Sequence, residues 1–183
     1  MVFLLEEESA KAMLQGVMPR LANDLPVRYI VFEGKQDLER QLERKLKGYL
    51  NPDARFIVLR DQDATPDCRA LKRSLLTKCQ KSKRPAKVRI ACRELESFYL
   101  GDLRAVEEGL GKTGLARKQT SNKFREPDRL HSPSKELERL TGGVYQKVSG
   151  SRAIGPHLDL NNSRSASFRN LIQAIRQSSR GGS

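Results

Sequence analysis

Four short apolar segments alternate with segments of helical periodicity through residue 106, and this alternation constrains the fold more than any other feature. The apolar segments are residues 2–5, 27–32, 54–60 and 88–93. Between and after them, apolar residues recur every three or four positions, as in the series Leu38, Leu42, Leu46 and Leu50. Apolar runs this short are typical of parallel strands covered by helices on both faces. The sequence therefore predicts an α/β fold with a parallel sheet flanked by helices.

Punctuating residues set the expected limits of the helices. Ser9 is expected to cap the first helix, which Pro26 ends, and Asn51-Pro52 to end the second. Asp67 is expected to cap the third helix, and a fourth is expected over residues 95–106.

Acidic residues follow three of the four predicted strands: Glu6 follows the first, Asp61 and Asp63 the third, and Glu94 and Glu96 the fourth. The carboxyl ends of parallel strands meet at one edge of a sheet, so these acids should converge. Carboxylates held together repel one another unless a cation lies between them. The pattern therefore predicts a Mg²⁺ or Mn²⁺ site of one or two ions, with Glu6, Asp61 and Asp63 as ligands and Glu94 or Glu96 sharing a second ion.

A glutamate follows the first strand and an Asp-x-Asp follows the third, with a helix, a strand and a helix between them. This order resembles the Toprim domain of primases, topoisomerases and overcoming-lysogenization-defect (OLD) nucleases. The resemblance covers roughly residues 1–105. The segments LLEEESAKAML, VLRDQDATPDCRALK and IACRELESFYLGD are similar to a bacterial family of small Toprim-like proteins encoded beside ABC-type ATPases in phage-defence gene sets. This resemblance implies a metal-dependent nuclease with an ATPase partner, in which Lys147 helps to neutralise the scissile phosphate.

Two features depart from the Toprim pattern. Glu7 stands where a glycine usually follows the first glutamate, which favours an alternative in which the chain binds nucleic acid or an ATPase without cutting. Glu33-Gly34 imitates the motif, but it leaves only one helix before Asp61. Glu6 leaves a helix, a strand and a helix, so we prefer Glu6 as the Toprim glutamate.

The net charge of +13 lies entirely after residue 61. Residues 69–93 hold ten Lys or Arg and no acid, a composition that indicates binding to a polyanion, most plausibly nucleic acid. Few aromatic residues are available to stack on bases, so contacts to the phosphate backbone are expected. The alternative is that these lysines and arginines form an exposed helix face that keeps the protein soluble and binds no polyanion. The residues expected to contact phosphates are Lys72, Arg73, Lys78, Lys81, Lys83, Arg84 and Lys87.

The remaining sequence is less regular. We expect a Toprim-like core over residues 1–108, an irregular basic extension packed on it over 109–177 and a disordered tail over 178–183. Within the extension, residues 109–133 should be a loop, Ser134 should cap a short helix to Leu140, and Ser167 should open a last helix. No apolar run is long enough to cross a bilayer, the acidic start is unlike a signal peptide, and three widely spaced cysteines indicate reduced thiols. A cytoplasmic protein is expected.

Overall fold

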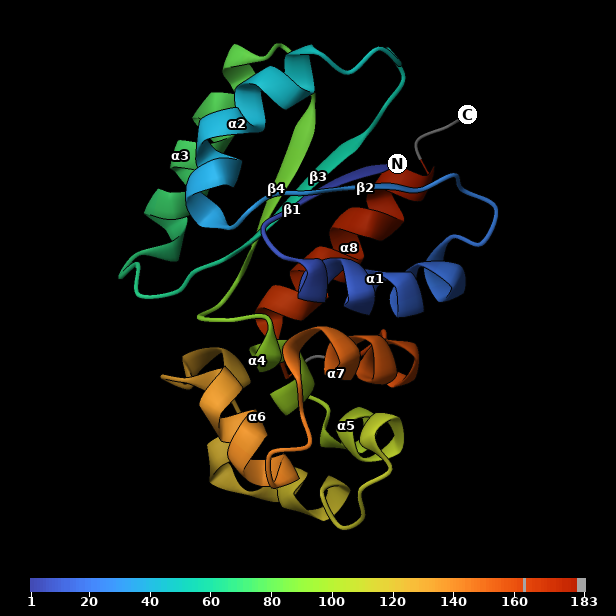
Figure 1. Ribbon diagram of the computed structural model, residues 1–183, viewed down its shortest axis with the longest axis vertical. Helices are drawn as coiled ribbons and strands as arrows, with labels where there is room; N and C mark the ends of the chain where they lie inside the picture. Colours follow the sequence, from blue (N-terminus) through green and yellow to red (C-terminus); the bar gives the residue numbers. More distant parts are fainter. Residues whose placement is uncertain (163, 181–183) are drawn as a thin grey trace.

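A four-stranded parallel sheet forms the centre of the molecule in the computed structural model, which describes residues 1–162 and 164–180 (Figure 1). The strands are β1 (Val2–Leu5), β2 (Arg28–Val31), β3 (Phe56–Asp61) and β4 (Ala86–Ala91). Their order across the sheet is β2-β1-β3-β4. The register pairs Leu5 with Leu59 and Asp61 with Ala91, so the carboxyl ends lie at one edge. The predicted α/β fold with a parallel sheet is confirmed.

Alternate side chains of the strands enter two separate cores. Helices α2 (Lys35–Lys47) and α3 (Cys68–Lys81) cover one face, where Leu4 and Val58 are buried. The other face carries Phe3 and Ile57 and is covered by α1 (Glu8–Leu21) and α8 (Ala166–Arg180). Burial on both faces explains why the central strands β1 and β3 are largely apolar, whereas the edge strands β2 and β4 are only partly buried.

A second group of helices lies beyond the carboxyl ends of the strands (Figure 1). It comprises α4 (Glu96–Leu100), α5 (Leu103–Leu110), α6 (Pro133–Thr141), α7 (Lys147–Ile154) and short 3₁₀ turns over 116–120, 122–124, 127–129 and 155–157. Helix α7 and the turn after it lie very close to α1, because a Cβ on Gly155 would be 2.6 Å from the carbonyl oxygen of Met13. The same apolar core contains Phe3 of β1, Ile154 of α7 and Ile175 of α8.

Several local expectations were wrong. The segment 95–106 is two helices, because Asp102 interrupts it and accepts a hydrogen bond from the Ala105 N–H as the cap of α5. Residues 147–154 are helical rather than irregular, and 3₁₀ turns interrupt the expected loop. Leu50 lies outside α2 and is 97% exposed.

The expected caps and limits of the outer helices also need correction. The cap expected from Ser9 is absent, since its hydroxyl donates to Glu7 instead. Asp67 caps α3 as predicted, by accepting from the Arg69 N–H at 2.7 Å. Helix α8 continues to Arg180, into the stretch expected to be disordered, and residues 181–183 lie outside the described part. None of the helices in that part is both long and apolar enough to cross a membrane.

Candidate active site

Glu6 and Asp61 lie side by side at the carboxyl edge of the sheet. Strands β1 and β3 are neighbours, Glu6 follows β1 directly, and Asp61 is the last residue of β3. The backbone N–H of Asp61 donates to Oε2 of Glu6 at 3.1 Å. The Oδ2 atom of Asp61 in turn accepts from the Leu95 N–H at 3.1 Å, which ties it to the segment after β4. The two acids that the Toprim resemblance paired are therefore brought together.

The sheet order places Glu33 on the side of Glu6 opposite Asp61. Glu33 follows β2, which lies on the side of β1 opposite β3. Its backbone N–H donates to Asp37 at 3.3 Å, a local contact at the start of α2. Glu6, and not Glu33, therefore follows the strand next to Asp61.

Glu94 and Glu96 have different surroundings, although both were expected near the site. The Oε2 atom of Glu94 accepts from the Ser134 N–H at 2.7 Å, so Glu94 caps α6, a role the sequence had suggested for Ser134 itself. Glu96 is 2% exposed and accepts a hydrogen bond from the Tyr145 hydroxyl at 2.9 Å. Its charge acts on Asp61, whereas Glu94 is engaged with α6. Glu96 is thus the better-placed third carboxylate.

The three buried carboxylates resist ionisation together. Burial raises the pKa of Asp61 well above its ordinary range, and the charges of Glu96 and Glu6 raise it further. Burial likewise raises the pKa of Glu6 and that of Glu96. Because each acid is poorly solvated and lies near like charge, a bound cation would reduce the cost of ionising them.

Two lysines at this edge each pair with a carboxylate. Lys147 lies 3.3 Å from Glu7. Burial acts to lower the pKa of Lys147, but the charges of Glu7 and Glu96 outweigh it and raise the pKa overall. Lys35 lies 3.1 Å from Oδ2 of Asp63, whose backbone is left-handed with φ of 55°. Asp63 therefore pairs with a cation at the start of α2.

The donor chemistry of the site fits a divalent cation, although its side chains are not arranged around one. Among residues 1–162 and 164–180, no three His, Cys, Asp or Glu side chains are placed to hold an ion together. The groups at the edge are nevertheless carboxylates, the ligands that Mg²⁺ and Mn²⁺ prefer, and their mutual repulsion is what a cation would relieve. Glu6, Asp61 and Glu96 would hold such an ion, and Asp63 would join them after releasing Lys35.

The predicted phosphate-binding residues are spread along the whole of α3 and beyond. Lys72 and Arg73 lie near its start, at the acidic edge, whereas Lys81 and Lys83 lie where the chain enters β4 at the opposite edge. Strand β4 separates these edges by about 17 Å, at roughly 3.3 Å per residue.

Arg73 pairs with Asp67 at 3.7 Å, and two cations at the far edge also have partners. The guanidinium of Arg84 lies 5.2 Å from the centre of the Phe56 ring. Lys87 donates to Gln177 at 3.2 Å. Arg84 and Lys87 therefore contribute to packing and are poor candidates for phosphate contacts.

Two residues at the site were not predicted from the sequence. Arg60 is 4% exposed, donates to the carbonyl of Asp61 at 2.7 Å and pairs with Glu39 of α2 at 3.1 Å. A charged residue inside an apolar strand was a signal for it. Tyr145, from the extension, reaches Glu96, and no sequence pattern indicated this contact.

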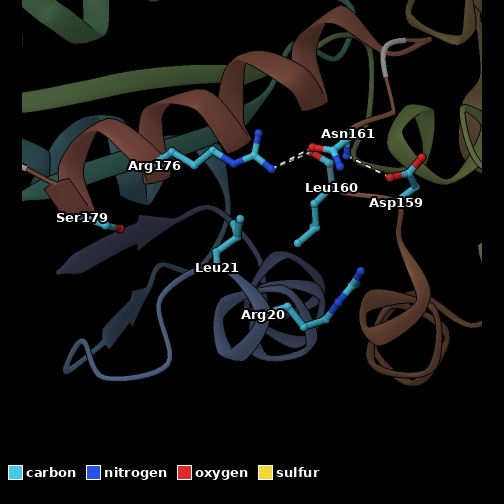
Figure 2. Close-up of a pocket in the computed structure, with 7 residues that line it drawn as sticks. All are labelled: Arg20, Leu21, Asp159, Leu160, Asn161, Arg176 and Ser179. Carbon is cyan, nitrogen blue, oxygen red and sulfur yellow. Dashed lines mark hydrogen bonds between the residues drawn. The ribbon is translucent and has the colours of Figure 1, made fainter.

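A separate cavity of about 460 Å³ lies between the end of α1, the turn 159–161 and α8 (Figure 2). Arg176 donates to Asn161 at 3.0 Å, and Arg20 donates to the carbonyls of Pro156 and Leu158 at 2.7 and 2.8 Å. Both arginines thus hold the segment 156–161 in place. None of the acids at the carboxyl edge lines this cavity.

Comparison with known proteins gives one family and one similar structure. A family profile described as "Domain of unknown function (DUF4276)" matches residues 5–176. The fold is similar to that of the C-terminal region of the Burkholderia pseudomallei OLD protein, with a TM-score of 0.59 and 16% identity over 97% of both chains. No curated protein matches the sequence.

Proposed function

Since the chain belongs to the DUF4276 family and has the fold of an OLD C-terminal region, we propose that it is a metal-dependent nuclease of Toprim type. It would hydrolyse phosphodiester bonds of DNA or RNA. The observation that carries the proposal is the placement of Glu6 and Asp61 at the carboxyl ends of adjacent parallel strands, with 3.1 Å between the Asp61 nitrogen and Glu6 Oε2.

Each group then has a defined task. Glu6, Asp61 and Glu96 would hold one Mg²⁺ or Mn²⁺, and Asp63, after releasing Lys35, would join them or help to hold a second ion. An ion held there would supply Lewis-acid polarisation of the phosphate and activation of water. Lys147 neutralises charge on the scissile phosphate, which would compete with Glu7 for its ammonium group. Glu94 is left out of this set because its carboxylate caps α6.

The experiment is cleavage of plasmid DNA and of RNA with Mn²⁺, comparing the wild type with Asp61→Asn. Asparagine keeps the size of the side chain and can accept the Leu95 hydrogen bond, so loss of activity would report the charge. Asp24→Asn, at an exposed position away from the edge, is the matched control. Activity that persists in Asp61→Asn would remove the proposed site.

One observation favours a second candidate function, that of a non-cutting subunit that holds nucleic acid or docks on an ATPase. Lys147 and Lys35 form salt bridges with Glu7 and Asp63, and no three acids of the described residues are placed to hold an ion together. Nucleic-acid binding without cleavage under any divalent metal would favour this alternative.

We further propose that an ABC-type ATPase is the partner and that the pair acts in anti-phage defence. The support is the family resemblance of the sequence, together with the absence of a GxxxxGKT nucleotide-binding motif. Adding the purified ATPase with ATP should change the cleavage rate, whereas an ATPase variant unable to hydrolyse ATP should not reproduce that change.

A further inference from the structure

The ring of Tyr145 is fixed from several sides. The residue is 5% exposed, and its backbone N–H donates to the Thr141 hydroxyl at 3.2 Å. Its ring meets that of Tyr99 edge to face, with centres 6.1 Å apart. A Cβ on Gly150 would lie 2.4 Å from Cδ2 of Tyr145, so only glycine there leaves room for the ring. The hydroxyl is therefore presented at a defined place.

The hydroxyl of Tyr145 contacts the carboxylate of Glu96. The Tyr145 hydroxyl donates to Oε1 of Glu96 at 2.9 Å, while the Ser151 hydroxyl is farther away at 3.5 Å. Among the side chains of the described residues, Tyr145 is the one that hydrogen-bonds to this carboxylate. A buried carboxylate with a single side-chain donor depends on that donor for its orientation.

Resting on the proposed nuclease function, we propose that Tyr145 is a positioning residue that holds Glu96 toward Asp61 for metal binding. The chain from Tyr145 to the start of α7 would then contribute two groups to the site, since Lys147 follows two residues later and pairs with Glu7. Hydrogen-bond partners that orient metal ligands typically change metal affinity by about tenfold or more when removed.

The test is titration of the purified chain with Mn²⁺ alone, followed by calorimetry or by the electron paramagnetic resonance of free Mn²⁺. Tyr145→Phe keeps the ring and removes the hydroxyl, so the Kd for Mn²⁺ should rise about tenfold. Two controls should stay within about twofold of the wild type. Ser151→Ala removes a neighbouring buried hydroxyl, and Tyr49→Phe removes a tyrosine hydroxyl at the other edge of the sheet.

A double-mutant cycle separates positioning from a general loss of packing. If Tyr145 acts through Glu96, Tyr145→Phe should add almost nothing to the effect of Glu96→Gln. Equal weakening in both backgrounds, or an unchanged Kd in Tyr145→Phe, would overturn the inference while leaving the nuclease proposal standing. A wild type that binds no Mn²⁺, or an Asp61→Asn variant that binds it equally well, would overturn both.

Discussion

Asp61→Asn should make the metal-free protein more stable at neutral pH, although it abolishes the proposed activity. Burial and the charges of Glu96 and Glu6 raise the pKa of Asp61, so ionising it costs free energy in the folded state; asparagine avoids that cost while still accepting from the Leu95 N–H. Substitutions that relieve unfavourable charge commonly add about 0.5–2 kcal/mol to the free energy of unfolding. For 183 residues the unfolding entropy is about 0.38 kcal/mol per kelvin, so Tm should rise by roughly 1–5 °C.

The stability gained by Asp61→Asn should depend on pH through the pKa of Asp61. The pKa of Asp61 is raised in the folded state above its ordinary value of 3.8. Below that value the carboxyl is protonated in both states and costs nothing. As pH rises toward the folded pKa, the unfolded chain loses its proton first, so the stability of the wild type falls. The advantage of Asp61→Asn should therefore be absent near pH 4 and grow toward neutral pH.

The assay is thermal unfolding followed by circular dichroism in the presence of a chelator, across this pH range. Replacing the chelator with Mn²⁺ should reverse the order, because a ligand at 100 times its Kd stabilises the wild type by about 2.7 kcal/mol. An Asp61→Asn variant that is less stable than the wild type at neutral pH without metal would refute the reasoning. So would a gain of equal size near pH 4 and at neutral pH.

Three further predictions concern other parts of the molecule. Glu6→Gln should abolish Mn²⁺-dependent cleavage while Glu33→Gln preserves it, because, of these two glutamates, only Glu6 follows a strand next to β3. Equal loss of plasmid cleavage in both variants would contradict this assignment. Gly155→Ala should lower the free energy of unfolding by about 1–3 kcal/mol in a denaturant titration, since its Cβ would lie 2.6 Å from the Met13 carbonyl oxygen; unchanged stability would mean that α1 and α7 can separate freely. Neutralising three cations near the acidic edge should reduce the log–log salt slope of duplex binding, measured by fluorescence anisotropy without metal, by about 2.7. The residues neutralised near the acidic edge are Arg69, Lys72 and Arg73. Neutralising Lys78, Lys81 and Lys83, at the far end of α3 and just beyond it, should reduce the salt slope less. A larger reduction from this second set would place the nucleic acid at the far end of α3.

The sheet could be predicted because buried strands appear in the sequence as short apolar segments. Much of the site instead depends on contacts between distant residues, which produce no local sequence pattern. The central strands β1 and β3 are apolar because both of their faces are covered. Their parallel pairing brings the acids after them to one edge. Helix α7 was missed because its Val-Ser-Gly-Ser run has low helix propensity, and packing against α1 decides its conformation. The choice between Glu94 and Glu96 depended on how the backbone turns into α4. Tyr145 lies 49 residues from Glu96, too far for any local pattern to link them.

The shared core of β1, α7 and α8 has a consequence for how the chain folds. Phe3 and Leu5 belong to the same apolar core as Ile154, Leu171 and Ile175, which come much later in the sequence. During synthesis, one face of the sheet therefore stays partly uncovered until α7 and α8 have emerged. Contacts so distant in sequence slow folding, because the loop must close before the contacts can form. A ribosome-bound chain that lacks α7 and α8 would expose this apolar face to chaperones and proteases.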